Sequence, residues 1–226
     1  MFIGHYGVAL AAKRAAPRTS LATFFVAAQL LDVLLALFVV AGVEKFRIVP
    51  GFTKTTPFDL TFVPYSHSLA ATVLWSALAA LVYGLAASGS GDKKARVTAA
   101  LVVGAVVASH FLLDFPMHVP DLPLGFDAGS PKVGLGLWDQ LDVSLVLEVS
   151  VLVAGGALYL GATRPREGSG AAPTIVVALV LLALAAAAPF VPPPGGPTEF
   201  SAQALGAFAV LALLALWVDR SREAFA

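Results

Sequence analysis

The chain has 226 residues, of which 58% are hydrophobic and 12% are charged, and its mean hydropathy is +0.87. Soluble domains have roughly 25% charged residues, so this composition indicates a membrane protein and leaves no room for a large soluble domain. The formal net charge is +0, which gives no global field that would attract nucleic acid. The absence of cysteine excludes disulfides, thiolate catalysis and cysteine-type zinc sites.

The first residues, MFIGHYGVALAAKRAAPR, place an apolar stretch before three basic residues. A secretory signal has the opposite order, so we interpret this segment as part of the mature protein. It is too short to cross a bilayer. It is predicted either as a short half-helix that brings His5 toward Asp32 near the bilayer centre, or as an amphipathic helix at the interface.

Six apolar segments follow, each long enough for a helix that crosses a bilayer. They cover residues 19–43, 65–87, 96–115, 138–162, 173–191 and 201–218. The sequence therefore predicts an all-α polytopic membrane protein of about six transmembrane helices. We expect residues 1–162 to hold the functional site and residues 163–226 to be a two-helix scaffold of the same membrane domain, because the last two segments lack buried ionisable residues.

The basic residues predict the orientation. With the N-terminus inside, ten of the 14 Lys and Arg residues lie in inside segments and four in outside loops. This asymmetry favours both termini in the cytoplasm and places the two long loops, residues 44–63 and 116–137, outside.

Asp32 lies in the middle of the first apolar segment, and His67 opens the second. Ionisable groups at membrane depth are costly and commonly functional. Asp32 is either a metal ligand, or a support for one, or the partner of Gln29 in a helix-packing hydrogen bond. His67 is either a metal ligand or an interfacial residue beside a helix-capping Ser66.

His110 and Asp114 are four residues apart, which on a helix places both on one face, one turn apart. This spacing is typical of two ligands for one metal ion, and the alternative is a neutral histidine bonded to an aspartate. His118 lies between Pro116 and Pro120, so we expect it outside the helix, either completing the site from the loop or exposed.

Glu148 lies inside the fourth segment. It is a candidate general base or proton relay, and bonding to a neighbouring helix is the alternative. Imidazole and carboxylate ligands without thiolate suit zinc, and also manganese or iron. We expect a divalent metal, with zinc first.

Four motifs, GHYGVAL, QLLD, PYSHSL and SHFLLDFPMHVPDLPL, occur in this order. Together they resemble the YdjM-like family of bacterial inner-membrane-associated proteins described as metal-dependent hydrolases. The resemblance covers about residues 1–160. It implies a helical membrane protein whose matching residues gather around a metal, namely His5, Asp32, His67, His110 and Asp114.

Three functions are compatible with this pattern. The first is a metal-dependent hydrolase of the bacterial inner membrane that acts on an amphiphilic ester or phosphoester, such as a lipid, with Asp32 or Glu148 handling protons. The second is a membrane transport protein that moves protons or metal ions through the same residues. The third is a non-catalytic membrane scaffold. The sequence leaves the oligomeric state open.

Overall fold

The structure is a computed structural model that describes residues 1–87, 92–168, 171–187, 190–192 and 195–225. These residues are mostly helical, which confirms the predicted all-α class. Their helices are α1 (Ile3–Ala15), α2 (Leu21–Ala28), α3 (Leu30–Val40), α4 (Leu69–Ala86), α5 (Lys93–Met117), η1 (Leu137–Asp139), α6 (Leu141–Ala162), α7 (Ala172–Ala187) and α8 (Pro197–Ser221).

All six predicted apolar segments contain helices, although not all are long enough to cross a membrane. The four helices α4, α5, α6 and α8 meet the length and hydropathy expected of a span, and α2 with α3 would make a fifth. Helix α7 has only 16 residues, and residues 188–189 of the segment predicted at 173–191 lie outside the described residues.

The first predicted span is broken. Helices α2 and α3 meet at Gln29 with a bend of 54°. We predicted one span over residues 19–43 from its apolar length, and AAQLLD contains no Pro or Gly that would signal a break. Asp32 therefore lies in the first turn of a new helix.

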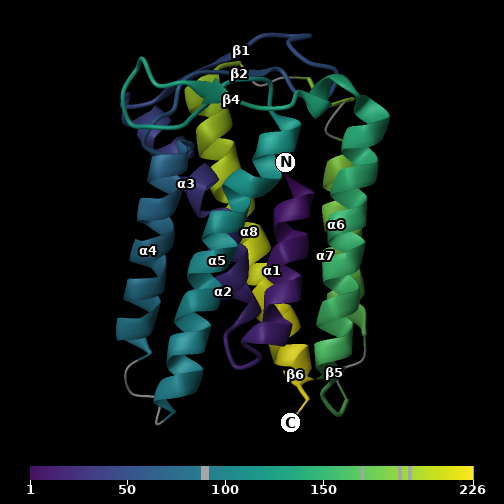
Figure 1. Cartoon of the computed structure of the whole chain (residues 1–226). Coiled ribbons are helices and arrows are strands. Elements are labelled where there is room, and N and C mark those ends of the chain that lie inside the picture. Colours follow the sequence, from purple (N-terminus) through teal and green to yellow (C-terminus); the bar gives the residue numbers. More distant parts are fainter. Residues whose placement is uncertain (88–91, 169–170, 188–189, 193–194, 226) are drawn as a thin grey trace.

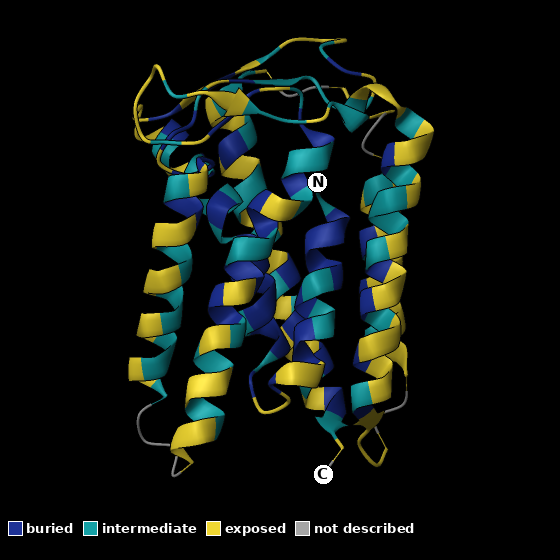
Figure 2. Ribbon diagram, viewed as in Figure 1, coloured by how far each residue is buried: buried dark blue, intermediate teal, exposed yellow. Residues whose placement is uncertain are grey.

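Helix α1 lies in the centre of the bundle and contacts α2, α5 and α6 (Figure 1). Its residues are largely buried, as the dark blue ribbon shows (Figure 2), so it is a core helix rather than an interfacial one. Two glycines allow this packing, because a Cβ on Gly155 of α6 would lie 1.9 Å from the carbonyl oxygen of Gly7. Small residues at such crossings let helix backbones approach closely.

The two ends of the bundle differ (Figure 1). One end is covered by a loop layer, which contains the antiparallel pairs β1 (Lys45–Ile48) with β2 (Phe58–Phe62) and β3 (Leu122–Pro123) with β4 (Lys132–Val133). The other end has the pair β5 (Thr163–Pro165) and β6 (Arg222–Ala224). The segments with ten of the 14 basic residues lie at this second end.

The outer helices expose apolar side chains along much of their length (Figure 2). On α4 these include Val73, Leu81, Val82 and Leu85. A continuous exposed apolar surface of this kind is unusual for a soluble monomer and is compatible with a lipid environment.

Candidate metal centre

All six predicted metal ligands lie together at the bundle end below the loop layer. We call this group the His/Asp cluster. Its members are His5 of α1, Asp32 of α3, His67 just before α4, His110 and Asp114 of α5, and His118 just after α5. All are buried except Asp32, whose side chain is 26% exposed.

His5, His110 and Asp114 form the first group of potential ligands. His5 Nε2 lies 3.2 Å from Asp114 Oδ1, and His110 Nε2 lies 3.1 Å from Asp114 Oδ2. The two imidazole rings are stacked with their centroids 3.9 Å apart. The predicted pairing of His110 with Asp114 along one helix face is therefore confirmed, and α1 adds a third residue to it.

Asp32, His67 and His110 form the second group. Asp32 Oδ1 lies 3.3 Å from His67 Nε2 and 3.7 Å from His110 Nε2. His110 thus belongs to both groups. Asp32 reaches this group from the first turn of α3, just after the break between α2 and α3.

The separations between these atoms fit metal coordination. Two ligand atoms at 2.0–2.2 Å from one tetrahedral ion are about 3.3 Å apart. The buried nitrogens also lack other partners, since His5 Nε2 and His110 Nε2 make no hydrogen bond despite lying near Asp114 oxygens. Buried polar atoms without partners are rare, and lone pairs that converge in this way are what a cation satisfies. The cluster can therefore hold a metal ion, whose identity the donor atoms leave open.

His110 is oriented by the broken helix. Its Nδ1 lies 2.8 Å from the carbonyl oxygen of Ala28, the last residue of α2. Since a carbonyl only accepts, Nδ1 carries a proton, and in the neutral ring Nε2 then presents its lone pair to the cluster. Such a bond fixes the tautomer and the ring orientation of a metal-binding histidine.

His67 is held by two residues that we did not assign to the site. Its Nδ1 lies 2.8 Å from Ser66 Oγ, which lies 2.5 Å from Glu44 Oε2. Burial raises the pKa of Glu44 above its ordinary value, while bonds from Ser66 and Tyr65 and the nearby His67 oppose the rise. Our alternative prediction made Ser66 the N-terminal cap of the helix after His67. Ser68 is the cap instead, because its Oγ accepts a hydrogen bond from the Ala71 N–H at the start of α4.

His118 lies outside the helix, as predicted, and is buried rather than exposed. Its Nε2 is 3.7 Å from Asp114 Oδ2, its Nδ1 is 2.9 Å from Asp121 Oδ1, and its ring packs against Trp138. Burial lowers the pKa of His118, and the neighbouring carboxylates oppose this effect. Among the members of the cluster, His118 approaches Asp114, at 3.7 Å, so it lies at the edge of the cluster and belongs to neither group of three.

Glu148 lies beside the cluster and holds α1 in place. Its two carboxylate oxygens accept hydrogen bonds from the backbone N–H groups of Phe2 and Gly4, at 2.8 and 2.9 Å. These bonds match the alternative that we gave for Glu148, which was bonding to a neighbouring helix. A role of Glu148 as general base stays a prediction.

The Met1 amino group lies 2.5 Å from Asp114 Oδ1, so a positive charge already contacts that carboxylate.

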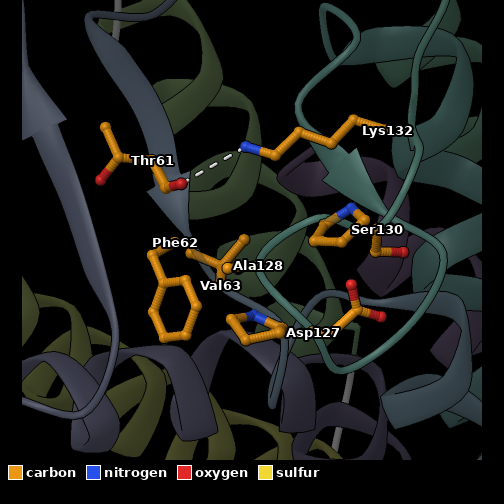
Figure 3. Close-up of a pocket in the computed structure, with 9 residues that line it drawn as sticks. Thr61, Phe62, Val63, Asp127, Ala128, Ser130 and Lys132 are labelled. Carbon is orange, nitrogen blue, oxygen red and sulfur yellow. Dashed lines mark hydrogen bonds between the residues drawn. The ribbon is translucent and has the colours of Figure 1, made fainter.

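The loop layer also contains a small hollow, lined by residues of β2 and of the segment between β3 and β4 (Figure 3). Lys132 projects across it and donates to the carbonyl oxygen of Thr61. None of its lining residues belongs to the His/Asp cluster. The hollow is therefore separate from the candidate metal centre.

No family model, curated protein or solved structure matches this chain. The resemblance to the YdjM-like family accordingly stays a prediction that rests on the four motifs quoted above.

Proposed function

We propose that this protein is a polytopic membrane protein of about six passes that binds a divalent metal ion, zinc first, and hydrolyses an amphiphilic ester or phosphoester near the membrane interface. The proposal extends the four candidate spans to six by counting α2 with α3 as one pass and α7 as another. The resemblance to the YdjM-like family implies the bacterial inner membrane, and the basic residues gathered at one end of the bundle favour both termini in the cytoplasm.

One observation carries the proposal: two groups of imidazole and carboxylate share His110, the first fully buried and the second including the more exposed Asp32. Ligands that are buried on one side and open on the other are typical of catalytic metal sites, whereas structural sites are closed. His67, His110 and Asp114, with His5, would hold the ion. A divalent ion in such a site lowers the pKa of bound water toward about 7 and so supplies a nucleophile.

Asp32 is the residue that we propose for proton handling. Its carboxylate is the most accessible in the cluster and lies 3.3 Å from His67 Nε2. Glu148 is less suited to this role, since backbone N–H groups of α1 occupy both its oxygens. Acceptance of a proton by Asp32 near the reacting water fits general base catalysis.

Two measurements test the proposal. Protein purified without chelator should contain about one divalent metal per chain, and a panel of ester and phosphoester lipids should include a substrate whose hydrolysis stops after chelation and returns with Zn²⁺. Less than about one metal per ten chains, with no uptake on adding metal, would contradict the metal site itself.

Labelling tests the topology, because the chain has no cysteine of its own. A cysteine introduced at Thr55 or Ser130 should react with an impermeant reagent from outside, and one at Glu167 only after the membrane is opened. The reverse pattern would mean that the His/Asp cluster faces the cytoplasm.

Transport of a proton or metal ion is the second candidate, and the broken helix favours it. Discontinuous helices near the bilayer centre are typical of ion sites in transporters, and the two groups that share His110 would offer neighbouring positions to a moving ion. Metal-dependent flux into liposomes, lost on Asp32→Asn and without any hydrolysis, would favour this function.

A further inference from the structure

The residues around His67 form a short hydrogen-bonded chain that starts in the loop layer. Glu44 lies in the connection between α3 and β1 and is buried. Its Oε1 accepts from the backbone N–H groups of Tyr65 and Ser66, at 2.6 and 2.9 Å. Its Oε2 accepts from Ser66 Oγ at 2.5 Å, and Ser66 Oγ lies 2.8 Å from His67 Nδ1.

The donors in this chain can be assigned one by one. The two backbone N–H groups make Oε1 an acceptor. Ser66 has a single hydroxyl proton, which it gives to Oε2 of the ionised Glu44. Its oxygen must therefore accept from His67 Nδ1–H, and the lone pair of His67 is left on Nε2. This nitrogen lies 3.3 Å from Asp32 Oδ1, on the side of the His/Asp cluster.

We propose that Glu44, acting through Ser66, is a positioning residue that keeps His67 in the tautomer able to bind the metal ion. The inference rests on the proposed metal site and extends it to a carboxylate outside the cluster. Carboxylates that orient metal-binding histidines commonly change metal affinity by 10–100-fold when they are lost.

The chain has a polarity that one substitution reverses. In Glu44→Gln the amide oxygen still accepts from the two backbone N–H groups, so the amide nitrogen faces Ser66 and donates to it. The hydroxyl proton of Ser66 then turns toward His67 Nδ1. Nδ1 must accept, and the ring proton moves to Nε2, where it blocks metal binding. The shape of the site is almost unchanged, because Gln and Glu are close to isosteric.

The test compares this variant with matched controls in detergent-solubilised full-length protein. We expect Glu44→Gln and Ser66→Ala each to weaken Zn²⁺ binding by about 10–100-fold in chelator competition. Glu199→Gln repeats the amide change at an exposed residue of α8, and Ser76→Ala removes a hydroxyl that bonds to nothing in the described structure. Both controls should stay near the wild-type affinity.

Nitrogen NMR of the histidine rings separates positioning from simple stabilisation. His67 Nδ1 should carry a proton in the metal-free wild type and should lose it in Glu44→Gln. A Zn²⁺ affinity near that of the wild type in both Glu44→Gln and Ser66→Ala, or an Nδ1 that stays protonated in Glu44→Gln, would overturn the inference. If Glu44→Gln does not fold, Ser66→Ala decides through its affinity.

The outcomes also keep the two proposals apart. If the wild type binds no Zn²⁺, the proposed metal site fails, whereas the NMR comparison still decides the direction of the hydrogen bonds. If the wild type binds Zn²⁺ and both Glu44→Gln and Ser66→Ala bind it equally well, only the role of Glu44 fails.

Discussion

The two ends of the bundle each bury charged and polar side chains, but they satisfy them differently. At the end with β5 and β6, Lys13 Nζ donates to the Thr19 carbonyl at 2.6 Å and to Asp219 Oδ1 at 3.0 Å, and Asp219 Oδ2 accepts from the Leu21 N–H. Arg222 likewise donates twice to Thr163. These groups pair with one another.

At the loop-covered end some of the buried polar atoms have no hydrogen-bond partner in the described structure. His5 Nε2 and His110 Nε2 face carboxylate oxygens without hydrogen-bond geometry, and Asp32 contacts two imidazoles. The comparison separates two uses of buried polarity. Groups that satisfy each other stabilise a fold, whereas buried ring nitrogens that face carboxylates without a hydrogen bond have a place for a cation.

The strongest test of this difference is loss of His110, which belongs to both groups of ligands. We expect His110→Ala to remove nearly all bound metal, which corresponds to a loss of metal affinity of at least about 100-fold. Loss of a direct ligand weakens metal binding more than loss of a residue that only orients a ligand. Elemental analysis after gel filtration measures it. Metal content equal to that of the wild type would mean that the cluster is a self-contained polar network.

A smaller effect should follow loss of His118, at the edge of the cluster. Its Nε2 faces only Asp114, at 3.7 Å. His118→Ala should therefore weaken Zn²⁺ binding by less than about tenfold, below the usual cost of a supporting residue. A loss as large as that of His110→Ala would make His118 a full ligand and extend the site into the loop layer.

The smallest effect on the metal should come from the opposite end. Asp219→Ala leaves Lys13 buried without its carboxylate, and removal of one partner of a buried pair typically destabilises by about 3–5 kcal/mol. Because the Asp219 side chain is 18% exposed, we expect about 2–3 kcal/mol here. Unfolding in detergent gives the stability, and elemental analysis should find wild-type metal content. Loss of metal would show that the two ends are coupled.

Sequence reasoning located the helices and the six members of the cluster, because apolar length and isolated ionisable residues are local signals. It missed the break at Gln29, which no Pro or Gly marks and beside which His110 contacts the Ala28 carbonyl oxygen. It also missed Glu44, whose position in a polar connection gives no sign that it folds back onto Ser66. Both features depend on contacts between distant segments, which a single sequence does not display.

The close crossing of Gly7 with Gly155, and the bonds from Glu148 to the start of α1, bear on how the protein is made. The partners Phe2 and Glu148 are 146 residues apart, which at 5–20 residues per second corresponds to roughly 7–30 s of synthesis. During that time α1 has no α6 to pack against. His5 therefore reaches its final place only after the fourth apolar segment has been made, and loading of the proposed metal site would be a late step of biogenesis.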